Sequence, residues 1–244
     1  MARTLLRHPF LVDRNRLLLL LGAAALALVV VAVVVSFGSG GGSDSSASTA
    51  ATTSATTSPA TLFAGLPQRG DTVGKASAPA SLLVYEDPKC PYCREWDLDT
   101  LPTVVRDYVR TGRIRLTYRG IAILGGNSVI GLRANYGAAP QSKLWNMVVA
   151  MYERQGDERT NWITVPVITD AAKAIGANPE QLLKDADSKA VTAMIEASQA
   201  EAASRGINQT PSFVVERPLT QPVELNVTGL DPDSFTATLD QALR

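Results

Sequence analysis

The chain has 244 residues, of which 45% are hydrophobic, and its 23 basic and 23 acidic residues give a formal net charge of zero. Without an excess of positive charge, the composition does not indicate a nucleic-acid partner. His8 is the only histidine, so no other position offers an imidazole as catalytic base or metal ligand. With only two cysteines, the chain lacks the ligand set of a structural zinc site, and we expect neither a metal nor another cofactor.

An unbroken apolar run from Leu17 to Val35 predicts a transmembrane helix. At ~1.5 Å per residue the run extends about 28 Å, close to the ~30 Å hydrocarbon core of a bilayer. Arginines precede the run, and no lysine or arginine follows it before Arg69. We therefore expect a cytoplasmic tail at 1–16, a single-pass anchor in the cell membrane at 17–35, and the rest of the chain outside the cytoplasm.

A cleaved signal peptide is the alternative interpretation of this N-terminal segment. It places the remainder of the chain in the same compartment, where disulfides persist. Residues 36–61 are rich in Gly, Ser, Thr and Ala, with little to bury, and predict a flexible linker. Residues 62–244 then form one globular domain.

The first half of this domain predicts a strand, a helix and a second strand. Residues 82–85 are apolar and favour a buried strand. The segment that follows opens a helix running toward Arg110, and Pro102 inside it is expected to kink it. Apolar and polar residues alternate over 114–119, which indicates the next strand. Because a helix separates these two strands, we expect them to pair in parallel.

Residues 128–205 predict an almost wholly helical insertion, in which Asn178 and Ser188 are expected to begin two helices. Two strands at 212–215 and 223–227 follow, close enough in sequence to pair antiparallel, and a last helix begins at Asp231. This order is that of an α/β, thioredoxin-like fold with a helical insertion, preceded by one transmembrane helix.

Cys90 and Cys93 are the only cysteines, and they lie three residues apart after the first strand. Such a pair can cycle between dithiol and disulfide, so thiol–disulfide exchange is the leading interpretation; an inert surface pair is the alternative. We assign Cys90, at the helix start, as the exposed reactive sulfur and Cys93 as the resolving one. The helix dipole contributes at most ~2 kcal/mol, or about 1.5 pKa units, so a lower pKa requires hydrogen bonds from the amides at 91–93.

Thr210-Pro211 is the second candidate element, between a helix end at Gly206 and the strand containing Phe213. Proline has no N–H, so it interrupts strand pairing and leaves a backbone edge open to an extended peptide. An ordinary trans proline at the start of a strand is the alternative.

Several motifs together resemble the DsbA-like thiol–disulfide oxidoreductases of bacterial membranes. They are Gly65 to Gly70, Val73-Gly74-Lys75, Asp87-Pro88-Lys89-Cys90-Pro91-Tyr92-Cys93 and Gly206-Ile207-Asn208-Gln209-Thr210-Pro211. The resemblance covers about residues 62–244. It implies a redox-active disulfide and a cis-proline at Pro211 that faces the cysteines. We take Pro91, Tyr92, Thr210 and Pro211 as the substrate-binding residues of this active site.

The resemblance also implies the partners and a proton relay. Reduced exported proteins would be the substrates, and a quinone-linked membrane protein, DsbB-like or vitamin-K-epoxide-reductase-like, would be the re-oxidase. Related proteins often carry an acidic residue six positions before the first cysteine, where this chain has Val84. Glu86 lies on the same strand face. We expect it to be a solvent-facing carboxylate, with proton relay as the alternative.

The sequence thus predicts an extracytoplasmic enzyme that forms disulfides in exported proteins through Cys90 and Cys93. A reductase or isomerase of the same fold is one alternative, because direction depends on the reduction potential. A redox-inert, membrane-tethered module that binds peptides through the proline edge is the other.

Overall fold

The computed structural model describes residues 58–244. The predicted cytoplasmic tail, membrane anchor and most of the linker lie outside this range. Among the residues described, no helix is both long and apolar enough to cross a bilayer. Folded structure begins before the predicted boundary at residue 62, with helix α2 (Pro59–Leu62). The reason is that Pro59 and Leu62 are buried, and the Asn146 side chain donates a hydrogen bond to the Pro59 carbonyl oxygen at 2.6 Å.

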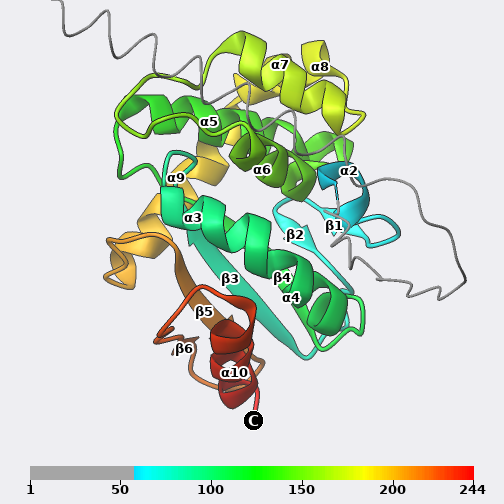
Figure 1. Ribbon diagram of the computed structural model, residues 1–244, viewed down its shortest axis with the longest axis vertical. Coiled ribbons are helices and arrows are strands. Elements are labelled where there is room, and N and C mark those ends of the chain that lie inside the picture. Colours follow the sequence, from blue (N-terminus) through cyan, green and yellow to red (C-terminus); the bar gives the residue numbers. More distant parts are fainter. Residues whose placement is uncertain (1–57) are drawn as a thin grey trace, which may run out of the picture. The chain divides into compact units, whose positions relative to one another are not determined.

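The described part of the chain forms one sheet with the strand order β1-β2-β4-β3-β5-β6 (Figure 1). Its strands are β1 (Gln68–Arg69), β2 (Thr72–Val73), β3 (Ala80–Glu86), β4 (Ile114–Gly120), β5 (Ser212–Glu216) and β6 (Val223–Glu224). The parallel pairing of β3 with β4 and the antiparallel pairing of β5 with β6 agree with the sequence predictions. The β1-β2 hairpin was not predicted, because two-residue strands leave no periodicity to detect.

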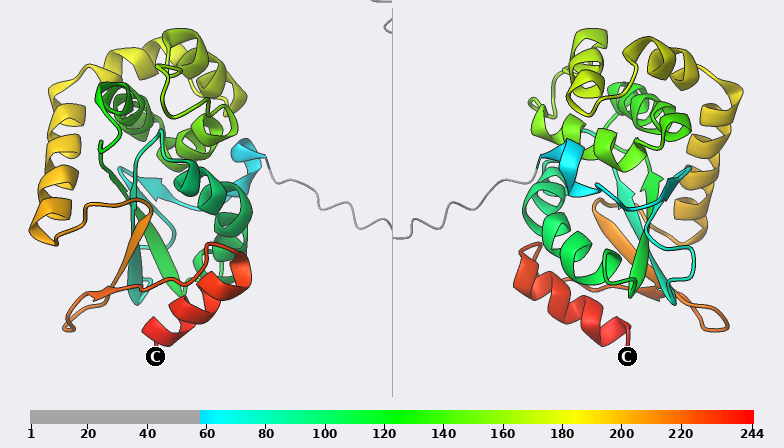
Figure 2. Two further views of the ribbon diagram at one scale, coloured as in Figure 1. Left: turned by 60° about the vertical axis from the view of Figure 1, so that its left-hand side comes forward. Right: turned by 90° about the vertical axis from the view of Figure 1, so that its right-hand side faces the viewer.

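β3 lies at the centre of the sheet because both of its faces are apolar, and all seven of its residues are buried. Leu82 and Val84 face the helices α3 (Pro91–Glu95), α4 (Leu101–Val104) and α10 (Pro232–Ala242), while Leu83 and Tyr85 face helix α9 (Lys189–Ser204). Figure 2 shows the sheet between these two layers. The carboxyl end of β3 is therefore enclosed on both sides.

The cysteine-bearing helix continues without a break from residue 91 to residue 109. It consists of α3 (Pro91–Glu95), a π-helical turn (Trp96–Thr100), α4 (Leu101–Val104) and a second π-helical turn (Val105–Val109). In the first π-helical turn the Leu101 N–H donates to the Trp96 carbonyl five residues earlier. Pro102, which has no N–H, follows directly, so the wider turn accommodates it without ending the helix.

The predicted helical insertion is present and lies at one end of the sheet (Figure 1). Its helices are α5 (Gly126–Gly137), α6 (Leu144–Glu153), α7 (Val165–Ala174), α8 (Pro179–Ala186) and α9, with a 3₁₀ turn at Ala139–Gln141. The two predicted N-caps are confirmed: the Asn178 side chain accepts from the Gln181 N–H, and the Ser188 side chain accepts from the Val191 N–H. Local capping chemistry thus sets where α8 and α9 begin.

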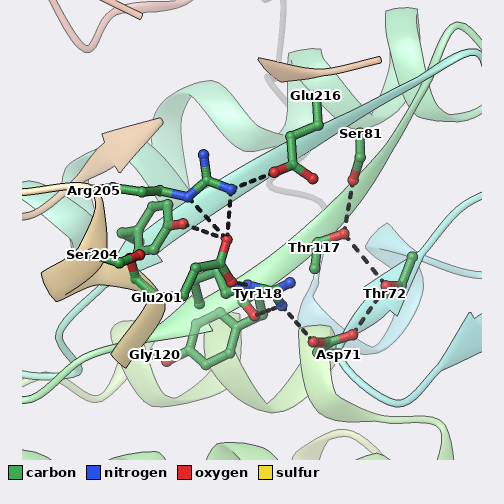
Figure 3. Close-up of polar contacts among 12 residues, drawn as sticks. Asp71, Thr72, Ser81, Thr117, Tyr118, Gly120, Glu201, Ser204, Arg205 and Glu216 are labelled. Carbon is green, nitrogen blue, oxygen red and sulfur yellow. Dashed lines mark hydrogen bonds and ion pairs between the residues drawn. The ribbon is translucent and has the colours of Figure 1, made fainter. Parts of the chain in front are cut away.

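A chain of ion pairs fixes α9 to the sheet (Figure 3). Arg119 on β4 contacts Asp71 and Glu201, each at 2.6 Å. Arg205, just after α9, contacts the same Glu201 at 3.0 Å and Glu216 on β5 at 2.5 Å. Because these side chains are partly buried and share partners, they hold the insertion against the sheet face opposite the cysteine helix.

Candidate active site

The two cysteines lie where β3 gives way to α3, at the end of the sheet that the insertion covers. Cys90 is the N-cap residue of α3, and Cys93 lies one turn further along. Both are free thiols. Cys93 is fully buried, and only 4% of the surface of Cys90 is exposed. The expectation of an exposed Cys90 is therefore wrong, although Cys90 is the more accessible of the two. The cause is the loop before β5, where the Thr210 carbonyl oxygen accepts a hydrogen bond from Cys90 Sγ at 3.3 Å.

The surroundings of Cys90 lower its thiol pKa from 9.0 to about 6. The largest cause is the hydrogen bond from the Cys93 thiol, and the Thr210 side chain and the backbone N–H groups of Cys93 and Tyr92 add to it against the opposing effect of burial. The predicted contribution from residue 91 is absent, because Pro91 has no N–H. Cys90 is consequently a thiolate for most of the time at neutral pH.

Cys93 has the opposite character. Burial raises its pKa well above the ordinary value, and its hydrogen bond to Cys90 raises it further. Cys93 therefore stays a thiol until a base removes its proton. The two sulfurs thus differ in acidity and burial, and the roles of nucleophile and resolving cysteine stay a prediction.

The predicted substrate-binding residues surround the reactive sulfur. The Thr210–Pro211 peptide bond is cis, and Thr210 contacts Cys90 although 120 positions separate them in sequence. Both residues are partly exposed. Pro91 and Tyr92 are exposed, and Tyr92 presents 62% of its surface. The site therefore has a large aromatic side chain on one side of Cys90 and a backbone edge on the other.

Asp87 organises the turn between β3 and Cys90. Its carboxylate is fully buried and accepts four hydrogen bonds. The donors are the N–H groups of Lys89, Ile123 and Leu124, each at 2.8 Å, and the Ser128 hydroxyl at 2.7 Å. Asp87 thus joins the cysteine turn to the segment that leads into α5.

Helix α6 and Gln155, two residues after its end, hold the same turn from the other side. The Tyr152 hydroxyl donates to the Asp87 carbonyl oxygen at 3.0 Å. The Gln155 side chain donates to the carbonyl oxygens of Pro88 and Cys90 at 3.1 and 3.0 Å. The insertion therefore supports the backbone of the cysteine motif, which explains why its helices lie at this end of the sheet.

Glu86 is not the solvent-facing carboxylate that we expected, because it is fully buried. β3 does not end in solvent: Glu86 pairs with Gly120, and its carbonyl oxygen accepts from the Ile121 N–H at 2.8 Å. Burial, together with the nearby Asp97, raises the Glu86 pKa well above its ordinary value. Asp97 is also fully buried. The sequence analysis missed it, although its position four residues after Cys93 places both on one helix face.

Comparison with known proteins places this geometry in a family. Residues 68–226 match the family model described as thioredoxin. The chain belongs to the thioredoxin family. Among curated relatives, the probable disulfide bond formation protein D of Bacillus cereus is 27% identical over 177 residues, covering 71% of this chain and 78% of the relative. Disulfide bond formation protein D of Bacillus subtilis is 24% identical over 147 residues, covering 59% of this chain and 66% of the relative.

Solved structures show the same fold. Oxidised BdbD from Bacillus subtilis superposes with a TM-score of 0.61 and 21% identity, over 73% of this chain and 97% of BdbD. DsbA2 from Pseudomonas aeruginosa superposes with a TM-score of 0.56 and 20% identity, over 73% of this chain and 96% of DsbA2. The predicted resemblance is thereby confirmed: this thioredoxin-family chain is a DsbA-like thiol–disulfide oxidoreductase.

Proposed function

We propose that this enzyme forms disulfides in exported proteins through the Cys90–Cys93 pair. The observation that carries the proposal is the lowered Cys90 pKa of about 6 beside a fully buried Cys93. A substrate thiolate attacks Cys90 in the disulfide form, and a second substrate thiolate then displaces Cys90 and leaves the enzyme reduced.

The difference in pKa between Cys90 and Cys93 also indicates whether the enzyme oxidises or reduces its substrates. Stabilising the Cys90 thiolate stabilises the reduced enzyme, because the disulfide form has no thiolate to stabilise. A shift from 9.0 to about 6 favours the reduced state by about 4 kcal/mol above pH 9 and by about 1–2 kcal/mol at pH 7. This favours an oxidase over the reductase alternative, and a reactive thiolate argues against a redox-inert binding module.

The substrate side of the proposal rests on what surrounds Cys90. Thr210 and Pro211 offer a partly exposed backbone edge, and Tyr92 offers an exposed aromatic surface. An extended, unfolded chain can use both, since backbone edges bind any sequence and an aromatic ring contacts apolar side chains. Reduced proteins that have not yet folded are therefore the proposed substrates.

The cellular part of the proposal follows from the N-terminal sequence. The apolar run at 17–35 anchors the enzyme in the cell membrane as a single-pass protein, with the catalytic domain outside the cytoplasm. There a quinone-linked membrane protein, DsbB-like or vitamin-K-epoxide-reductase-like, re-oxidises the cysteine pair. Glu86 serves as the proton relay at Cys93.

Oxidative refolding tests the proposal directly. The oxidised full chain is mixed with a reduced, unfolded disulfide protein such as ribonuclease A, and regain of ribonuclease activity is measured. We expect wild type to oxidise the substrate stoichiometrically, and Cys90→Ser to be inactive. The equilibrium of the Cys90–Cys93 pair with glutathione gives its reduction potential and hence the direction of exchange. A potential near −120 mV identifies an oxidant, and one near −270 mV a reductant. Equal behaviour of wild type and Cys90→Ser would refute the proposal.

A further inference from the structure

Two carboxyl groups lie next to the cysteine pair in the core without a cation to neutralise them. Glu86 ends β3, Asp97 lies in the π-helical turn after α3, and both are 0% exposed. None of their four carboxyl oxygens has a hydrogen-bond donor among the described residues. The ion pairs found in residues 58–244 include neither of them. The two carboxyl groups lie within hydrogen-bonding reach of each other.

This arrangement requires a proton. Carboxylates only accept hydrogen bonds, so two ionised groups cannot bond to each other, and in the protein interior their charges repel. One proton turns one carboxyl into a donor and satisfies the other. Adjacent carboxyls in other proteins share a proton for this reason.

The titratable groups that face the pair come from three elements. They are Cys90 and Cys93 on α3, Tyr118 on β4 and Tyr152 on α6. Burial raises the pKa of both tyrosines well above their ordinary value, so these hydroxyls keep their protons at neutral pH. While Cys90 Sγ is bonded in a disulfide or mixed disulfide it holds no proton, so the carboxyl pair is the group beside Cys93 that can give or take a proton near neutrality.

We propose that Glu86 and Asp97 act as one acid pair that shares a proton and exchanges protons with Cys93 during each redox cycle. The inference rests on the proposed function and deepens it. It adds Asp97 as a positioning residue that acts through Glu86. No hydrogen bond joins Cys93 Sγ to either carboxyl, so the proton crosses after rotation of the Glu86 carboxyl or through one water molecule.

The pair supplies a proton when substrate is oxidised. A substrate thiolate attacks Cys90 Sγ, a bond forms between these two sulfurs, and the Cys90–Cys93 bond breaks with its electron pair leaving on Cys93. The doubly protonated pair gives one proton to Cys93, which becomes a thiol. A second substrate thiolate then attacks the substrate sulfur, the substrate loses two electrons in total, and Cys90 leaves as a thiolate.

The pair takes the proton back when the enzyme is re-oxidised. A disulfide of the re-oxidising partner, or oxidised glutathione, first forms a mixed disulfide with Cys90. Cys93 must then lose its proton to attack Cys90 Sγ, and the singly protonated pair accepts it as the partner's thiolate leaves. A lone buried carboxyl would stay protonated and could not accept, whereas the shared proton stabilises the singly charged form.

The closing of the Cys90 mixed disulfide is the step to measure. The reduced full chain is mixed with oxidised glutathione, and closure is followed by acid quenching and mass spectrometry between pH 5 and 9. The variants are Glu86→Met, Asp97→Leu and the double substitution, which keep volume but remove the carboxyls. Asp99→Leu, at an exposed position in the same helical turn, is the matched control.

We expect each single variant to close at least about tenfold more slowly than wild type at pH 7, as for loss of a general base. The double variant should be no slower than the slower single variant, because the pair acts as a unit. In both single variants, the plot of closure rate against pH should lose the ionisation near neutral pH. The Asp99→Leu variant should keep it. Apolar replacement of an uncompensated buried acid should leave the fold intact or stabilise it.

A wild-type closure rate and pH profile in Asp97→Leu would overturn the inference and leave Glu86 as a lone relay. The inference would also be overturned if the double variant closed more slowly by the product of the two single-variant effects. Carbon-13 NMR of the labelled wild-type carboxyls gives an answer that needs no variant: a joint titration of both signals supports the shared proton, and independent titrations overturn it. A wild type that exchanges no thiols with glutathione would remove the proposed function itself, a different result from slow variants.

Discussion

At the scale of single residues, the reactivity of Cys90 comes mainly from hydrogen bonds and less from its position at a helix start. The shift of its pKa from 9.0 to about 6 corresponds to about 4 kcal/mol, whereas a helix dipole contributes at most ~2 kcal/mol. The Cys93 thiol contributes most to the low pKa of Cys90.

Replacing Cys93 by alanine tests this activation. Because the hydrogen bond from Cys93 is lost and bonds to charged groups contribute ~1.5–3 kcal/mol, we expect the Cys90 pKa to rise by about one to two units. The pH dependence of Cys90 alkylation by iodoacetamide, or thiolate absorbance, gives the midpoint. A midpoint that stays near its wild-type value would show that the helix start alone activates Cys90.

Thr210→Val provides a second test at this scale. The substitution keeps the side-chain shape and removes the hydroxyl that helps to lower the Cys90 pKa. We expect the alkylation midpoint to rise by up to about one unit, less than in Cys93→Ala, because the Thr210 side chain lowers the Cys90 pKa less than the Cys93 thiol does. Thr220→Val, at an exposed position of the β5–β6 loop, serves as control and should leave the midpoint unchanged.

At the scale of elements, the helical insertion holds the cysteine turn in place. Asp87 accepts hydrogen bonds from Ile123, before α5, and from Ser128 in α5, while Tyr152 in α6 and Gln155 just after it donate to the turn. On the far face of the sheet, Arg119 and Glu201 fix α9 to β4. The insertion is thus fastened at both ends, and the active-site turn depends on it for its backbone hydrogen bonds.

Asp87→Ala tests this dependence. The substitution leaves buried donors without an acceptor, so we expect the free energy of unfolding to fall by about 3–5 kcal/mol. Asp99→Ala, which removes an exposed carboxylate nearby, should change it by less than about 0.5 kcal/mol. Urea unfolding followed by tryptophan fluorescence measures both. Similar stabilities of the two variants would mean that the hydrogen bonds of Asp87 do not hold the turn.

At the scale of the whole molecule, redox state and stability are linked. The reduced protein contains a thiolate that the fold stabilises, and the oxidised protein does not. Folding lowers the Cys90 pKa, so its contribution is complete above pH 9, the unfolded value, and is lost as the pH falls through about 6. The molecule should therefore favour its reduced form most strongly at alkaline pH.

Unfolding of the two redox forms across pH checks this linkage. From Cys90 alone, we expect the advantage of the reduced over the oxidised form to be about 4 kcal/mol above pH 9, about 1–2 kcal/mol at pH 7 and close to zero below pH 5. Urea unfolding of both forms at each pH supplies the difference. An advantage that is constant with pH would contradict the lowered Cys90 pKa.

The linear sequence determined those features that neighbouring residues set. The helix starts at Asn178 and Ser188 depend on a side chain that reaches an N–H three residues away, and the pairing of β3 with β4 depends on the short helical connection between them. The cysteine pair was recognisable because its spacing alone indicates thiol–disulfide exchange.

Only the tertiary structure decided what each functional group touches. Glu86 was expected in solvent and is buried, because β3 and β4 still pair at this position and the strand does not end in solvent. Thr210 reaches Cys90 across 120 positions, and Asp97 meets Glu86 from a different element. Burial and long-range contact set pKa values, and both depend on what packs against a residue, which its neighbours in sequence do not specify.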